Sequence, residues 1–102
     1  MIAGHYRPIG EGTLTVGTDS VGIVQAVGIV TADISRADAA LISVHTNPIF
    51  YRMTAEAATG DTDSHHKAVD SEFVLVGQYQ IGNFRAIQDG GGAVLHITLF
   101  RA

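Results

Sequence analysis

The sequence contains no cysteine and no tryptophan, and its basic residues form no cluster. Without cysteine, the chain has no disulfide bonds, no thiolate metal site and no cysteine nucleophile. The lysine and arginine residues are scattered singly in a chain whose formal net charge is −4. Because nucleic-acid binding needs a concentrated basic surface, we expect no direct contact with nucleic acid.

Long apolar runs are missing as well. No segment approaches the roughly 20 consecutive apolar residues of a membrane span, and the first residues lack an apolar stretch of signal-peptide length. We therefore expect a protein that is made in the cytoplasm and does not contact a membrane. Hydrophobic residues nevertheless make up 46% of the chain and charged residues only 16%. This balance predicts that a partner covers part of the surface.

Turn-forming residues define the fold class. The chain has 12 glycines, and its short alternating segments are separated by turn signals, which is typical of an all-β sandwich or small barrel. A chain of 102 residues is expected to form one domain. We predict a small antiparallel β-sandwich, jelly-roll-like, over residues 13–102. Residues 1–12, with three glycines and Pro8, are expected to form an extended N-terminal arm outside the core.

The centre of the predicted fold is the segment 39–53, which we interpret as two strands hinged at 46–48. Pro48 cannot donate to a strand ladder and disfavours helical backbone in the residue before it, so the chain should bend there. Alternation then assigns side chains to two faces. The inward set that should hold the sandwich together is Ile42, Val44, Ile49 and Tyr51. The outward set is His45, Phe50 and Arg52.

The remaining elements follow from local patterns. Strands are predicted at 13–16, 71–76, 84–87 and 93–100, the last with Leu95, Ile97 and Leu99 inward. The apolar segment 21–30 is interpreted as one long strand, or as two short strands with a bulge at Gly28. Single helical turns are expected at 35–38, with Ser35 as its cap, and at 78–83. Residues 54–66 form the longest predicted loop, and 89–92 form a hairpin loop.

Five histidines are the most obvious candidates for a metal site: His5, His45, His65, His66 and His96. Imidazole is the commonest protein ligand for metals, and His45 and His96 are potential cross-strand neighbours. However, neither an HxH nor an HExxH spacing occurs. The acidic residues of the 54–66 loop do not match a calcium-binding loop either. We therefore expect no metal and no cofactor, with the histidines facing solvent or a partner.

No catalytic motif accompanies these residues. A G-x-S-x-G sequence is absent, and the glycines at 90–92 are followed by neither a lysine nor a helix start, so they predict a turn rather than a phosphate loop. We therefore predict that the protein is not an enzyme. Arg52 and Arg85 are isolated charges inside strands. They either occupy the solvent face, or pair with acids such as Asp70 or Glu72, or dock the carboxylates of a partner.

The part of the chain after residue 38 resembles a group of short proteins from the structural-gene modules of tailed bacteriophages. The residues that carry the resemblance are, in order, Ala39-Ala40-Leu41-Ile42-Ser43-Val44, Pro48-Ile49-Phe50-Tyr51-Arg52, His65-His66, Phe84-Arg85-Ala86-Ile87, Gly90-Gly91 and Ala93-Val94-Leu95-His96-Ile97-Thr98. The group has a Gly/Thr/Pro-rich loop after the arginine, whereas residues 54–59 here contain neither glycine nor proline. The resemblance implies a small β-sandwich virion component.

From this resemblance we expect a capsid decoration (cement) protein that stabilises contacts between coat subunits. Its partners would be the major capsid protein or other virion proteins, and it would form a homo-oligomer, either a dimer or a trimer. It would be made in the host cytoplasm and reside in the virion. The alternatives are a neck, tail or fibre-associated virion subunit, and a lectin- or cupin-like ligand-binding barrel. The predicted interface residues are His5, Tyr6, Arg7, His45, Phe50, Arg52 and Arg85.

Overall fold

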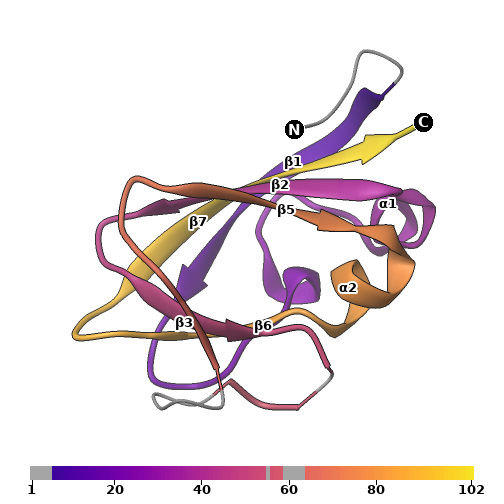
Figure 1. Cartoon of the computed structure of the whole chain (residues 1–102). Helices are drawn as coiled ribbons and strands as arrows, with labels where there is room; N and C mark the ends of the chain where they lie inside the picture. Colours follow the sequence, from indigo (N-terminus) through magenta and orange to yellow (C-terminus); the bar gives the residue numbers. More distant parts are fainter. Residues whose placement is uncertain (1–5, 55, 59–63) are drawn as a thin grey trace.

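The computed structural model of the chain describes residues 6–54, 56–58 and 64–102 (Figure 1). Within them, seven strands and three short helices follow one another along the chain. These elements are β1 (Arg7–Val16), the 3-10 helix η1 (Ile23–Gln25), α1 (Thr31–Arg36), β2 (Ala39–His45), β3 (Ile49–Arg52), β4 (His65–Lys67), β5 (Glu72–Val76), α2 (Gly77–Asn83), β6 (Arg85–Gln88) and β7 (Ala93–Arg101).

The strands form two antiparallel sheets that pack on each other, which confirms the predicted all-β sandwich. Sheet A has the order β1-β7-β2-β5 and sheet B the order β4-β3-β6. In Figure 1 the two layers lie one above the other, and the helices lie between and beside them. An isolated bridge joins Val21 to Ala86 of β6, at the place where sheet B would take a fourth strand. The jelly-roll type itself stays a prediction.

One bent hairpin contributes strands to both sheets. β2 of sheet A continues into β3 of sheet B, and β4 of sheet B returns into β5 of sheet A. Between the pairs Ser43–Glu72 and Ile49–Lys67, the first strand contains one more residue than the second. An extra residue on one strand produces a bulge that bends the ladder. The predicted hinge at 46–48 is confirmed, and it coincides with this extra residue.

The hinge is held by backbone conformation and by a neighbouring loop. Thr46 has a φ of 78°, a conformation that ordinary residues rarely adopt and that turns the chain sharply. The Asn47 side chain donates a hydrogen bond of 2.8 Å to the Gly92 carbonyl. The Asp89 N–H donates to the Pro48 carbonyl at 3.1 Å. The hinge and the β6–β7 loop therefore fix each other.

The core lies between the sheets and follows the predicted alternation. Ile42, Val44 and Ile49 are fully buried, while Tyr51 is partly buried and packs against them from the edge. The inward residues predicted for β7, namely Leu95, Ile97 and Leu99, are also fully buried. Complete burial of each such aliphatic side chain contributes about 1.5–3 kcal/mol. The structure describes no buried polar or charged residue, so hydrophobic packing accounts for the described interior.

Residues 7–12 were predicted to belong to an extended arm, but they form the first part of β1 and so belong to sheet A. This strand pairs with β7 along its length, with a register shift between Pro8 and Gly10. Proline and a bulge are both tolerated on an edge strand such as β1. Gly12 is needed for packing, since a Cβ there would lie 2.4 Å from the Val27 carbonyl oxygen. Residues 1–5 of the predicted arm lie outside the described part of the chain.

The segment 21–30 also differs from its prediction, because it is neither a long strand nor two short ones. Val21 bridges to Ala86 of sheet B, and Val27 bridges to Thr13 of sheet A. Between them the chain forms η1, where the Gly22 N–H donates to the Gln25 side chain at 2.7 Å. This segment therefore crosses from one sheet to the other instead of extending either.

The two predicted helical turns have different outcomes. α2 confirms the turn at 78–83 and begins one residue earlier. The turn at 35–38 is displaced, because α1 begins at Thr31 and its N-cap is Val30. Ser35 is not a cap but lies inside this helix, where its hydroxyl donates to the Ala32 carbonyl at 2.9 Å. A serine that bonds to a carbonyl one turn earlier satisfies its hydroxyl within the helix.

A glycine exchange tests the close approach between β1 and the crossing segment. We expect Gly12→Ala to lower the free energy of unfolding by about 1–3 kcal/mol, since its Cβ would meet backbone that cannot move aside easily. Gly17→Ala is the matched control, because a Cβ there meets nothing within 4 Å. Urea unfolding of both variants measures the difference. Equal stability of the two variants would contradict the described packing.

Candidate functional site

The outer face of sheet A is the broadest surface on which strands present side chains outward. The strand register arranges this face in four rows, each crossing neighbouring strands. The rows are Pro8–Phe100–Ala39–Val76, Glu11–Thr98–Leu41–Val74, Thr13–His96–Ser43–Glu72 and Thr15–Val94–His45. The first two rows are mainly apolar, whereas the last two carry histidines, hydroxyls and a carboxylate. The face therefore has an apolar half and a polar half.

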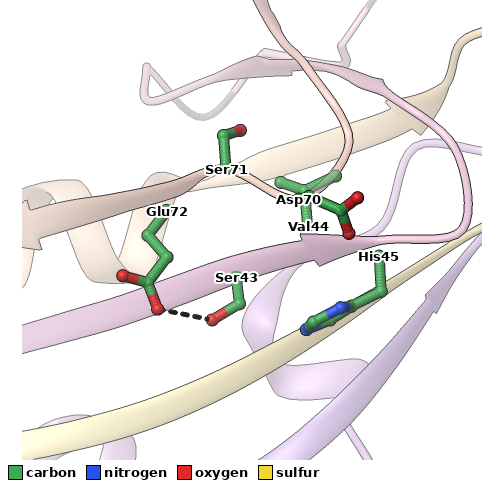
Figure 2. Close-up of a pocket in the computed structure, with 6 residues that line it drawn as sticks. All are labelled: Ser43, Val44, His45, Asp70, Ser71 and Glu72. Carbon is green, nitrogen blue, oxygen red and sulfur yellow. Dashed lines mark hydrogen bonds between the residues drawn. The ribbon is translucent and has the colours of Figure 1, made fainter.

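An open depression of about 460 Å³ lies at the polar end of this face, where β2 ends and β5 begins (Figure 2). Its lining includes the side chains most able to perform chemistry: Ser43, His45, Asp70 and Glu72. Asp70 adopts a φ of 62° in the bend that leads into β5. The depression is therefore a product of the bent hairpin.

The arrangement of these groups does not activate a nucleophile. The Ser43 hydroxyl donates to the Glu72 carboxylate at 3.3 Å, the only hydrogen bond drawn among these residues in Figure 2. In a catalytic triad a histidine stands between the serine and the acid. Here His45 occupies the next row of the sheet. The Ser71 hydroxyl points away and donates to the Ala68 carbonyl.

The described residues do not gather a set of metal ligands at the depression. Among residues 6–54, 56–58 and 64–102, no group of three or more histidine, aspartate or glutamate side chains is placed to hold a metal ion. His96 pairs with Ser43, and His45 pairs with Val94. The two histidines are thus diagonal neighbours on one face rather than a direct cross-strand pair. His96 instead lies near Glu11, with 3.9 Å between Nε2 and Oε1.

The predicted interface residues lie at three separate places. Arg7 is exposed at the far end of sheet A, opposite Arg101 of β7, and Tyr6 precedes it half-buried. His45 lies at the other end of that sheet. Phe50 belongs to sheet B, as do Arg52 and Arg85, while His5 is outside the described residues. Their role in an interface stays a prediction, and the structure does not gather them into one patch.

Arg52 and Arg85 face each other on adjacent strands of sheet B but have different partners. The Arg52 guanidinium pairs with Glu56 at 2.5 Å, so neither Asp70 nor Glu72 is its acid. Arg85 packs over the backbone of Gly22 and donates to the Phe84 carbonyl at 3.3 Å. Local partners therefore hold both arginines, and Glu72 is used by Ser43 on the other sheet.

Phe50 lies on the outer face of sheet B, as its alternation predicts. Its ring meets His66 edge to face, with 5.1 Å between the ring centres. The His66 Nε2 atom lies 2.8 Å from an Asp89 carboxylate oxygen. Such an exposed pair contributes little, roughly 0–1 kcal/mol. Phe50 is half-buried by these neighbours and is therefore less available to a partner than the sequence suggests.

The sequence interpretation missed the apolar side chains that the helices expose. Val24, Val27 and Val30 are 57%, 79% and 57% exposed, and Val76 and Tyr79 on the α2 side are 61% and 68% exposed. Val24 lies in η1 and Tyr79 in α2, while Val30 and Val76 are the N-cap residues of α1 and α2. Val27 lies two residues after η1, and α1 packs against both other helices. The sequence signal for three of them is the three-residue spacing of Val24, Val27 and Val30. These valines belong to the segment 21–30, for which the sequence predicts strand.

Comparison of the chain with protein-family models, with curated proteins and with solved structures gives no match. In the described residues, no helix is both long enough and apolar enough to span a membrane.

The ionisation of Tyr51 provides a pH-dependent test of the side of sheet B that packs against the core. Its ring stacks on Phe73 with 4.6 Å between centres, and burial raises the pKa of its hydroxyl above the ordinary value of 10.0. The folded state therefore favours the neutral phenol. Because the unfolded chain ionises first, stability is complete below about pH 10 and falls as the pH rises above it.

We expect the unfolding free energy of the wild-type chain to fall more steeply above about pH 10 than that of Tyr51→Phe, which has no phenol to ionise. Ultraviolet titration should also show the last-titrating tyrosine disappear in this variant. Tyr79→Phe is the matched control, because Tyr79 is 68% exposed. If Tyr51→Phe and Tyr79→Phe have the same alkaline profile, Tyr51 is not held in its neutral form by the fold.

Proposed function

We propose that this protein is a structural virion subunit of a tailed bacteriophage, and specifically a capsid decoration protein that binds across neighbouring coat subunits. The observation that carries the proposal is the set of exposed apolar side chains on the helical side: Val24, Val27, Val30, Val76 and Tyr79. Each of these side chains is more than half exposed, and exposed apolar surface is the kind that another protein covers.

The distribution of polar groups supports a contact role rather than catalysis. The described interior holds no buried polar or charged residue, and the serine, histidine and acids of sheet A stay on the surface. Active sites usually contain groups whose environment shifts their pKa values, and burial beside charges produces such shifts. The described part of the chain gives no buried charge of that kind.

A ligand-binding barrel would need an enclosed pocket with convergent polar groups. The depression on sheet A is open, and a second one of about 90 Å³ is lined by Arg52, Met53, Thr54 and His65 at the end of β3. Nonpolar side chains fill the space between the sheets. These observations favour assembly over small-molecule binding.

The proposed mechanism is the addition of buried contact area. Each subunit would place its helical side on coat subunits, and the apolar area removed from water would stabilise their contact at about 25 cal/mol per Å². Many weakly stabilised contacts add up over a capsid. The particle would then resist heat and internal genome pressure better with the subunit than without it.

A surface substitution tests the contact. We expect Val27→Lys to weaken binding to capsids, because a charge would be placed where apolar surface is to be buried. Its thermal unfolding should change little, since the side chain is 79% exposed and only its backbone bridges to β1. Thr18→Lys introduces the same charge at an exposed turn and is the control. Co-sedimentation of each purified variant with capsids that lack the subunit measures binding.

The location is tested in the phage that encodes the chain. Quantitative mass spectrometry of purified virions should find hundreds of copies per particle, whereas a neck, tail or fibre subunit would be present at the copy number of a few rings. Virions made without the gene should lose their genome at a lower temperature. Absence from the virion, or unchanged heat resistance without the gene, would refute the decoration role.

A further inference from the structure

The two sides of the sandwich differ in whether their strand edges are paired with another segment. The segment 17–29 covers the free edges of β1 and β6. Thr13 and Val27 exchange backbone hydrogen bonds of 2.9 and 2.8 Å, and Val21 and Ala86 exchange bonds of 3.0 and 2.8 Å. One side of the sandwich is therefore closed by backbone pairing. The opposite side contains the edges of β4 and β5.

The backbone of β5 alternates between paired and outward groups. The Val44 N–H donates to the Ser71 carbonyl, and the Gly77 N–H donates to the Asp38 carbonyl, both at 2.9 Å. In an antiparallel ladder alternate residues direct both backbone groups to the same side. The odd-numbered residues of this strand therefore bond toward β2. Glu72, Val74 and Val76 direct their N–H and C=O groups outward from the sheet.

This edge lacks the usual protection against pairing. Natural edge strands are blunted by lysine, proline or bulges, and Glu72–Val76 contains no lysine, no proline and no register shift. One outward group is occupied, because the Gln80 side chain accepts a hydrogen bond of 2.8 Å from the Val76 N–H. Behind the edge, the Tyr51 ring stacks on Phe73, and the Phe84 ring lies tilted against Phe73. Among the described residues, no backbone group of another segment bonds to the outward groups of Glu72 and Val74.

We propose that β5 pairs in antiparallel fashion with β5 of a second copy of this chain, so that two copies of sheet A form one continuous sheet. A sheet edge binds an extended strand through its outward backbone groups. In a pair of copies, β5 of each chain is both the edge and the extended strand. A two-fold axis makes the same edge serve both copies. The pairing goes beyond the proposed virion role, since it would occur in the purified protein whether or not a capsid is present.

The side chains of β5 are compatible with this symmetry. The register that uses most of the free groups sets Val74 opposite Val74 of the second copy, where the two residues exchange N–H and C=O. Glu72 then lies opposite Val76 of the second copy, and Phe73 lies opposite its Leu75. Valine pairs and aromatic–aliphatic pairs stabilise antiparallel strands, while like charges placed opposite each other destabilise them. The like-charge pairing arises only if the register centres on Glu72.

Sedimentation velocity of the full-length chain at rising concentration tests the proposal. The wild-type chain should be a dimer at high concentration. Val74→Lys and Val74→Glu should each raise the dimer dissociation constant by about tenfold or more, because each places two like charges opposite each other. Mixing the two variants should restore a one-to-one dimer, since the opposed charges then attract.

Thr15→Lys is the control, because it lies on the same outer face at the covered β1 edge and should leave the dimer intact. Circular dichroism and thermal unfolding of each variant establish that it is folded. A wild-type chain that stays monomeric would overturn the proposal and would leave β5 to a strand of another protein. A dimer that is unaffected by both Val74 variants would also overturn it. Capsid binding is a separate measurement, so the two proposals can fail independently.

Discussion

The bend at Thr46–Pro48 is the constraint on which the rest of the structure depends. At this point one hairpin leaves sheet A and enters sheet B, and the second strand of the hairpin returns through Asp70. Both sheets therefore share the same pair of strands, and their separation and angle follow from a single bulged turn. The hydrogen bond from Asn47 to Gly92 connects this turn to the loop between β6 and β7. That loop also passes from sheet B to sheet A, and because β6 and β7 belong to different sheets it does not close the hairpin predicted at 89–92.

The bend also determines which side chains lie on the surface. The depression lined by Ser43, His45, Asp70 and Glu72 exists because the hairpin turns there, and its groups face solvent with one hydrogen bond between them. On the far side of the interior, the crossing segment uses its backbone to close two sheet edges, and in doing so it leaves Val24 and Val27 outside. A segment that bonds at both ends has few ways to bury every apolar side chain between them.

Much of the fold could be predicted from the sequence, because period-two alternation is strong where a strand buries one face. The strands at 39–45, 49–52 and 93–101 and their inward residues show this directly. The prediction for residues 7–12 was wrong because Gly12, a residue type that usually marks a turn, serves here for close approach to Val27 and Ile29. The segment 21–30 failed because an unbroken apolar run has no period that separates a strand from a crossing segment.

The candidate site was less predictable from the sequence than the fold. Local patterns show which face a side chain takes, but they do not show which strand lies beside it. The partner of Arg52 is Glu56, only four residues away, whereas the partner of Glu72 is Ser43 on a different strand. The relation between His45 and His96 depends on a register that no local pattern contains.

The central claim is that one bent hairpin builds both sheets and leaves the β5 edge open, and residue-resolved amide hydrogen exchange tests it most directly. In dilute solution, the amides of Phe73 and Leu75 should exchange slowly because they bond to β2, while those of Glu72 and Val74, which alternate with them, should exchange fast. The Asn47→Ala variant should speed exchange in β2 and β3 together. Equal protection of all β5 amides in the dilute chain would contradict an open edge, and exchange in β2 and β3 that responds separately would contradict a single bent hairpin.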